Sequence, residues 1–193
     1  NLTINRPTTD YVGLFGRTNG ASIRNIGLLG GSVKGNGSVG GLVGYNNSSI
    51  SNAYATGSVT GSYSVGGLVG ENYGGISNAY ATGAVTGSDI TGGLTGMNWG
   101  GISNAYATGS VTGDIFVGGL VGESNGGISN AYWNKETTGQ LSGVGQGFNA
   151  GMGLNTDQMF NQSMGFDFNN IWGNGNNQTT PYLKNLANNQ VFN

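Results

Sequence analysis

Cysteine and histidine are absent from all 193 residues of this chain. Their absence excludes disulfide scaffolds, metal sites built on Cys or His, thiol chemistry and any histidine-based triad or general base. Charge is also scarce: six basic and eight acidic residues leave a net charge of −2, and no basic residue lies between Gly35 and Asn134. Because phosphate neutralisation needs clustered Lys and Arg, we expect no nucleic-acid partner. We also expect no cofactor and no bound metal.

Long apolar runs are missing as well. No window approaches the roughly 18 continuous apolar residues of a membrane-spanning helix, so we expect no membrane insertion. The chain has no basic-then-apolar signal peptide and starts with Asn1 rather than Met, and we interpret it as a processed or excised piece of something larger. Glycine supplies 41 residues, but the 10% aromatic and 36% hydrophobic content argues against disorder.

The sequence repeats itself every 26 residues, and this repeat determines the expected architecture. A Val-Gly-Gly-Leu-Val-Gly segment and its variants occupy Val39–Gly44, Val65–Gly70, Thr91–Gly96 and Val117–Gly122. An Ile-Ser-Asn-Ala-Tyr segment occupies Ile50–Tyr54, Ile76–Tyr80, Ile102–Tyr106 and Ile128–Tyr132. A degenerate earlier copy lies at Gly13–Gly16 and Ile23–Asn25.

Each copy contains three short apolar pieces between glycine or Asn-Gly turns, a pattern typical of short strands. Helices are not expected, because glycine recurs too often and no apolar stripe with 3.6-residue spacing survives. The fold class is therefore predicted to be all-β: a parallel β-helix (β-solenoid) of about five stacked coils over residues 1–138. Coils about 4.8 Å apart place each residue over its counterpart in the next coil.

Stacking converts the repeated residues into columns. The expected inward columns are Leu42, Leu68, Leu94 and Leu120; Ile50, Ile76, Ile102 and Ile128; and Val59, Val85 and Val111. Asn52, Asn78, Asn104 and Asn130 are expected to stack as an amide ladder between coils. Strict alternation from Ile50 buries Tyr54, whereas alternation back from Val59 leaves Tyr54 outside. We therefore predict a corner or bulge near Asn52, with the tyrosines outside because four of them would overfill a thin core.

The repeated unit, Gly-Gly-Leu-Val-Gly followed by Asn, Gly-Gly-Ile-Ser-Asn-Ala-Tyr-Ala-Thr-Gly and Val-Thr-Gly, resembles the GLUG repeat of bacterial surface and secreted proteins. The resemblance covers roughly residues 12–132, and the segments Tyr132–Gly139, Gly153–Met159 and Phe166–Trp172 resemble what commonly follows such arrays. It implies a large exported adhesin-like or filamentous-haemagglutinin-like protein, or a repeat region attached to a secreted protease. It implies no catalytic residues. The first copy departs from the pattern at Ile26–Leu29, so the tyrosine column should stop there.

The remainder, residues 139–193, is expected to be a glycine-rich loop and a C-terminal capping segment. Gly139–Gly153 is predicted to be the loop. Thr156 is a candidate N-cap for a short helix over about Asp157–Gln162. Large apolar residues then concentrate at Phe166, Phe168, Ile171, Trp172, Tyr182 and Leu183. We interpret this segment as a cap covering the last coil, with an independent binding module as the alternative.

A polysaccharide-active enzyme is the main alternative in another functional class. Without histidine, acid–base chemistry needs paired carboxylates. Glu71 and Glu123 hold the same repeat position two coils apart, but Met97 lies between them. Asp89 and Asp114 are expected near one corner on adjacent coils, as a weak cation site at most. Because charges at exposed turns are most often solubility features, we expect no enzyme.

A second alternative is an ice-binding face. Thr56, Ser58, Thr60, Thr82, Thr86, Thr108, Ser110 and Thr112 would form a hydroxyl lattice on one side of the stack. Gly57 and its counterparts interrupt this lattice, and Ala84 breaks its middle column. A solvated strand face is therefore the simpler interpretation.

Tyr73 and Trp99 are the candidate ligand-binding residues. They occupy the same turn position in adjacent coils, beside flexible glycines, where stacked rings can hold sugars or a partner's apolar surface. Mutual packing over the turn is the competing interpretation. Asn47 and Asn125 flank them at the same position, so the expected platform is two coils long.

The favoured function is a non-catalytic structural and adhesive segment of a bacterial cell-surface or secreted protein. Its expected location is extracellular or the bacterial cell surface, and its expected partners are a host or neighbouring-cell surface, a glycan or matrix protein, or further copies of itself. Leu2–Ile4 is predicted to be a strand that begins partway through a coil, without a cap. Unpaired strand edges there fit either further coils upstream or a self-assembling extracellular filament.

Overall fold

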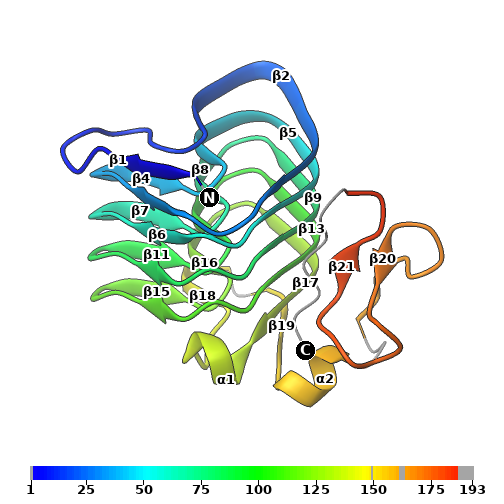
Figure 1. Cartoon of the computed structure of the whole chain (residues 1–193). Helices are drawn as coiled ribbons and strands as arrows, with labels where there is room; N and C mark the ends of the chain where they lie inside the picture. The colour runs from blue at the N-terminus through cyan, green and yellow to red at the C-terminus, as the bar shows by residue number, and fades with distance from the viewer. Residues whose placement is uncertain (1, 149, 161–163, 187–193) are drawn as a thin grey trace.

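A computed structural model describes residues 2–148, 150–160 and 164–186. Its parallel strands stack in register into a β-solenoid of about six turns (Figure 1). One face consists of β1 (Thr3–Asn5), β3 (Ser32–Lys34), β6 (Ser58–Thr60), β10 (Val85–Thr86) and β14 (Val111–Thr112). The next consists of β4 (Gly37–Gly40), β7 (Tyr63–Gly66), β11 (Ile90–Gly92) and β15 (Phe116–Gly118).

The largest sheet contains two strand segments from most coils. In chain order these are β2 (Phe15–Leu28), β5 (Val43–Ala55), β8 (Val69–Asn72), β9 (Gly75–Ala81), β12 (Thr95–Asn98), β13 (Gly101–Ala107), β16 (Val121–Ser124), β17 (Gly127–Asn134), β18 (Val144–Gly147) and β19 (Met152–Leu154). A middle coil therefore has four short strands where the sequence predicted three. The Gly-Leu-Val region is divided at Gly67 and Leu68, between β7 and β8.

The register follows the 26-residue repeat. Ile76 pairs with Ile50 and Ile102, and Val85 pairs with Val59 and Val111. All four leucines of the predicted column are completely buried, and the isoleucine and valine columns are buried as well, except that Ile128 is partly exposed in the last full coil. The three predicted inward columns are therefore confirmed.

The interior is thin because glycine faces alanine across it. A Cβ added to Gly67 would lie 2.8 Å from the Ala81 Cβ, and one added to Gly93 would lie 2.8 Å from the Ala107 Cβ. Both distances are too short for two methyl groups. A larger residue at either glycine would have to push the coil apart, which is why this position recurs as glycine.

The predicted corner lies at Asn52. This residue and its counterparts Asn78, Asn104 and Asn130 have φ between 47° and 50°, in the left-handed region that asparagine tolerates better than most residues. The corner reverses the alternation, so Ile50, Ala53 and Ala55 all pack in the solenoid core, and Tyr54 packs outside it.

The amide ladder predicted at this corner is only partly formed. Asn52 Nδ2 donates to Asn25 Oδ1 at 3.1 Å, and Asn130 Nδ2 donates to Asn104 Oδ1. Within the described residues, however, the Oδ1 atoms of Asn52 and Asn78 are buried without a hydrogen-bond partner. Left-handed backbone geometry, more than a continuous side-chain ladder, accounts for asparagine here.

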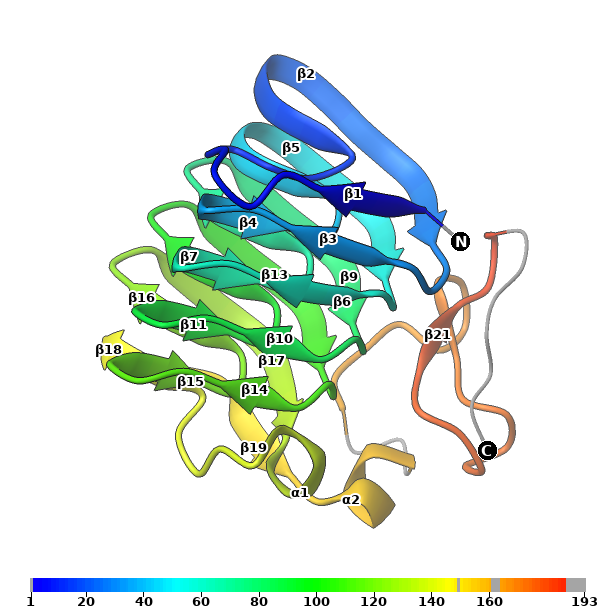
Figure 2. The same ribbon diagram turned by 60° about the vertical axis from the view of Figure 1, so that its left-hand side comes forward.

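The C-terminal segment, residues 155–160 and 164–186, lies along the side of the stack, beside β9, β13 and β17, in both views (Figures 1 and 2). It includes the antiparallel pair β20 (Trp172–Gly173) and β21 (Tyr182–Leu183). It buries the tyrosine column under Met159, Met164, Phe166, Trp172 and Leu183. The tyrosines point out of the solenoid, as predicted, but they are buried under this cap. The expectation that these large apolar residues cover the last coil is therefore corrected: they pack on the outward-pointing tyrosines and remove those rings from water.

The glycine-rich segment 139–153 is not the expected loop. It contains β18 and β19, which pair with β16 and β17 and continue the stack past residue 138. These strands account for about six turns in place of the expected five. The short helix α1 (Lys135–Thr138), which was not predicted, precedes them and is capped by Asn134.

The predicted short helix is α2 (Thr156–Phe160), so the expected end at Gln162 lies outside the described residues. Its cap is Asn155 and not Thr156: Asn155 Oδ1 accepts from the Gln158 amide, and Gln158 Oε1 accepts from the Asn155 amide. This reciprocal pair is a capping box, which satisfies two backbone donors at the helix start.

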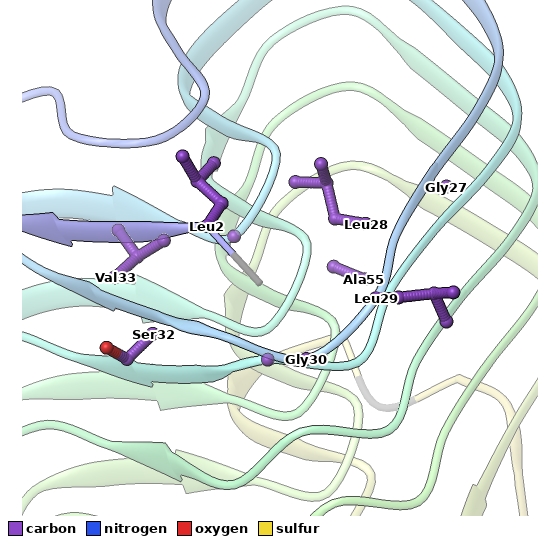
Figure 3. A pocket seen from close by; sticks show the side chains of 10 residues that line it. Leu2, Gly27, Leu28, Leu29, Gly30, Ser32, Val33 and Ala55 are labelled. Atoms are coloured by element: carbon purple, nitrogen blue, oxygen red, sulfur yellow. The ribbon is translucent and has the colours of Figure 1, made fainter.

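At the other end of the stack, Thr3 and Ile4 in β1 pair with Ser32 and Val33, as predicted for the partial coil. Gly27 pairs with Tyr54, so the tyrosine column stops there, as also predicted. A hollow of ≈ 140 Å³ lies inside this coil, lined by Leu2, Leu28 and Val33 among others (Figure 3).

Candidate functional site

Tyr73 and Trp99 lie together on the turn that leads into β9 and β13. Their ring centroids are 6.2 Å apart with an interplanar angle of 10°, and their side chains are 42% and 48% exposed. The structure thus brings the two predicted residues together as parallel, solvent-facing rings.

Two further rings lengthen this pair. Tyr45 stacks on Tyr73 with centroids 5.1 Å apart, and Tyr11 meets Tyr45 edge-on at 5.9 Å. The aromatic ladder, defined as Tyr11, Tyr45, Tyr73 and Trp99, corrects the expected two-coil platform. The repeat does not show this extension, because the position equivalent to Tyr73 in the preceding coil is Asn47. Tyr45 pairs in register with Glu71, and its ring reaches Tyr73 in the next coil.

Arg17 lies at the Tyr11 end of the aromatic ladder. Its guanidinium carbon is 4.4 Å from the Tyr11 ring centroid and 4.5 Å from that of Tyr45. Guanidinium groups interact favourably with aromatic faces at such distances. The ladder therefore has a cation at one end, and at the other end the turn position next to Trp99 is Asn125.

Glu71 borders the ladder. Its Oε1 accepts a hydrogen bond from Ser38 Oγ at 2.5 Å. The pKa of the Tyr73 hydroxyl is raised, mainly by partial burial and then by the negative charge of Glu71. The Tyr73 hydroxyl therefore stays protonated at neutral pH, where it can both donate and accept hydrogen bonds.

A buried polar ladder holds the turns that carry these rings. Asn46 Nδ2 donates to Asn72 Oδ1, and Asn72 Nδ2 donates to Asn98 Oδ1, both at 2.8 Å. Thr18 and Ser124 extend it at the two ends. Each amide also donates to the carbonyl two residues later, as from Asn72 to Gly74. Because Asn72 and Asn98 directly precede Tyr73 and Trp99, this ladder fixes the ring positions. Its sequence signal is asparagine at the same step of 26 residues.

The aromatic ladder provides a surface that a partner can contact. Stacking uses the faces of the inner rings, so the surface available to a partner consists of ring edges, tyrosine hydroxyls and the exposed indole of Trp99. Such a surface combines apolar area with hydrogen-bonding groups and loses little side-chain entropy when a partner binds.

The acidic pairs considered for catalysis differ in their geometry. Met97 pairs with both Glu71 and Glu123, so it separates the two carboxylates as predicted. Asp89 and Asp114 do not lie over one another: the Asp114 amide donates to the Ser88 carbonyl, and the Phe116 amide donates to the Asp89 carbonyl. The expected adjacent acidic pair is thus offset by one residue.

The hydroxyl lattice is divided in two. Ser58, Thr60, Thr86 and Thr112 lie on β6, β10 and β14, and Ser110 directly precedes β14. Thr56, Thr82 and Thr108 instead line a groove that faces Phe160 and Thr180 of the C-terminal segment. A single flat face, as ice binding requires, is therefore not formed by these residues.

Neither helix in residues 2–148, 150–160 and 164–186 is long and apolar enough to cross a membrane. The GLUG motif model matches residues 35–60 and residues 61–86. The two matches are consecutive units of the 26-residue repeat. No curated protein and no solved structure matches the chain. The chain therefore contains a GLUG-repeat region.

Proposed function

We propose that this chain is a non-catalytic structural and adhesive segment of a bacterial cell-surface or secreted protein. The exposed aromatic ladder carries the adhesive part of the proposal, because four rings and a guanidinium contact one another in succession across adjacent coils. In-register coils support the structural part: each coil is bonded to its neighbours along its length, so the stack resists bending. The proposed partner is a glycan or matrix protein on a host or neighbouring cell.

Two observations favour a non-catalytic role. The Glu71 carboxylate accepts a hydrogen bond from Ser38 Oγ at 2.5 Å. Met97 lies between Glu71 and Glu123 in the stacked register. A general acid–base pair needs both carboxylates to reach one substrate bond. The buried methionine, with 9% of its surface exposed, blocks that approach.

The test is binding of the purified chain to arrays of glycans and matrix proteins. Trp99→Ala and Tyr73→Ala should each weaken binding several-fold, because each removes ring area from the contact. Leu141→Ala is the matched control, since it removes a side chain that is 91% exposed and outside the aromatic ladder. Equal binding by all three variants would contradict the adhesive role, and sustained depolymerisation of a glycan would contradict the non-catalytic one.

A further inference from the structure

A second site lies at the other end of β9 and β13 from the aromatic ladder. A groove of ≈ 390 Å³ separates the solenoid corner from the C-terminal segment. Its solenoid wall is the column Thr56, Thr82 and Thr108, which directly follows β5, β9 and β13. Backbone hydrogen bonds from Thr82 to Ala55 (3.1 Å) and from Thr108 to Ala81 (3.0 Å) keep this column in register. We call this site the threonine groove.

The hydroxyls in the column are not equivalent. Thr56 Oγ1 accepts from the Gly30 amide at 2.7 Å and is 3.4 Å from the Leu28 carbonyl, to which it can donate. Thr82 and Thr108 are half-buried, and their hydroxyls have no hydrogen-bond partner within the described residues. Two hydroxyls, one coil apart, are therefore available to donate to and accept from a ligand.

The opposite wall supplies an aromatic ring and further polar groups. Phe160 closes α2, and Thr180 lies just before β21; both line the groove. Hydrogen bonds hold the end of the groove that Asn134 and Thr156 line. Asn134 caps α1 with its Oδ1 and donates from Nδ2 to Thr156 Oγ1 at 3.0 Å. A cleft with one apolar ring and several fixed hydroxyls is typical of ligand pockets between two parts of a protein.

The charges around the groove restrict the class of ligand. The residues that line it are Thr, Asn and Phe, so no lining residue ionises. At the edge of the groove the Glu136 carboxylate accepts from the Thr156 hydroxyl at 2.6 Å, and the Lys135 ammonium lies close enough to Glu136 to lower its pKa. Asp157 on α2 adds a second exposed negative charge at this end. The lining therefore offers an anionic ligand no cation to pair with, and the groups at this edge include two carboxylates and one ammonium.

We propose that the threonine groove binds a neutral saccharide. Hydroxyl groups of the sugar would exchange hydrogen bonds with Thr82 and Thr108, and an apolar sugar face would pack against Phe160. This site is independent of the aromatic ladder, because the whole length of β9 and β13 separates the two corners. It adds a binding activity whether or not the ladder is adhesive.

The experiment measures binding of the full chain to defined hexasaccharides. Neutral hexasaccharides of glucose, mannose and galactose are compared with a uronic acid hexasaccharide, using amide chemical shifts and calorimetry. At least one neutral probe should shift the Thr82 and Thr108 amides. The Thr82→Val, Thr108→Val double variant should bind it about tenfold more weakly, because two hydrogen bonds are lost at constant shape.

Thr112→Val is the matched control, since Thr112 is exposed on β14, away from the groove. It should bind like the unmodified chain, and Trp99→Ala should too, which separates this site from the aromatic ladder. Unchanged folding of the double variant is checked by its thermal midpoint. The proposal is overturned if no neutral probe binds, if the uronic acid probe binds as well as the neutral ones, or if the double variant binds normally.

Discussion

Trp133 pairs in register with Ala107, so an indole ring stands in the last full coil, where the three preceding coils carry the methyl groups of Ala55, Ala81 and Ala107. The ring is 5% exposed and fills the interior beside Gly119 and Gly143. A Cβ on Gly143 would lie 2.4 Å from it. Trp133 therefore fills the solenoid core in the last full coil.

Gly143→Ala should destabilise the chain by about 1–3 kcal/mol, because the added methyl overlaps the indole and the packed coil yields little. Gly101→Ala is the control, since a Cβ there meets nothing within 4 Å, and it should stay within about 0.5 kcal/mol. Chemical denaturation measures both. Equal effects would show that Trp133 does not fill the core.

Tyr80 and Tyr106 stack with centroids 5.0 Å apart and 4° between planes, yet their hydroxyls differ. Tyr106 donates to the Pro181 carbonyl, whereas the buried Tyr80 hydroxyl has no partner among the described residues. Tyr106→Phe should cost about 1–2 kcal/mol, because it leaves a buried carbonyl unpaired. Tyr80→Phe should be neutral or stabilising. The free energy of unfolding is measured for both variants. A larger loss of stability from Tyr80→Phe than from Tyr106→Phe would contradict the hydrogen bond between Tyr106 and the C-terminal segment.

Thr95 occupies a position held by valine in the neighbouring coils, where it pairs with Val69 and Val121. It is completely buried, and its hydroxyl finds no hydrogen-bond partner in the described part of the chain. Thr95→Val should therefore stabilise the protein by about 1 kcal/mol or more, since it removes an unsatisfied buried hydroxyl at constant shape.

Thr18→Val is the contrasting variant, because the Thr18 hydroxyl donates to Asn46 Oδ1 at 2.8 Å. It should destabilise by about 1 kcal/mol. Thermal unfolding compares the two substitutions. A loss of stability in Thr95→Val would mean that its hydroxyl has a partner.

Glu136 links α1 to α2 by accepting from the hydroxyl and the amide of Thr156, at 2.6 and 3.0 Å. These hydrogen bonds lower the pKa of the Glu136 carboxyl from its ordinary value of 4.5. Because the folded-state pKa is lowered, the contribution to stability is present above pH 4.5 and is lost as the pH falls through the lowered pKa.

The Thr156 amide resonance should therefore shift at a pH below 4.5, and Glu136→Gln should abolish this shift. A pH titration by NMR from 7 to 2 measures both. A transition at or above pH 4.5 would contradict the link between the helices.

The 26-residue repeat alone was sufficient to predict the β-solenoid, because each column forms as soon as adjacent coils pair in register. Leu94 must lie under Leu68 and over Leu120 once the coils stack, and no distant contact affects that choice. The corner at Asn52 was predictable for the same reason, since two incompatible alternations meet within five residues. The number of strands in each coil was harder to predict, because the break between β7 and β8 at Gly67 leaves no gap in the apolar pattern of the sequence.

Tyr73 and Trp99 were predictable as neighbours because they share a repeat position. Tyr45 was not, because it joins them from another position through the reach of its side chain. The buried Asn46 and Asn72 ladder has the clearest repeat signal that was overlooked. Polar residues are usually placed outside, and these lie inside because each amide satisfies its hydrogen bonds with the next coil.

The sequence by itself determined the parallel stack, the three apolar columns and the absence of cysteine or histidine chemistry, since these follow from composition and from a repeat whose contacts join adjacent copies. Only the tertiary structure decided where residues 139–148, 150–160 and 164–186 lie. Those residues do not repeat, so nothing in their spacing says whether Phe166 and Trp172 cover the end of the last coil or its side. They cover its side because the thin core leaves the stacked tyrosines outside it at the Asn52 corner. Packing Trp172 against these tyrosine rings removes their apolar surface from water.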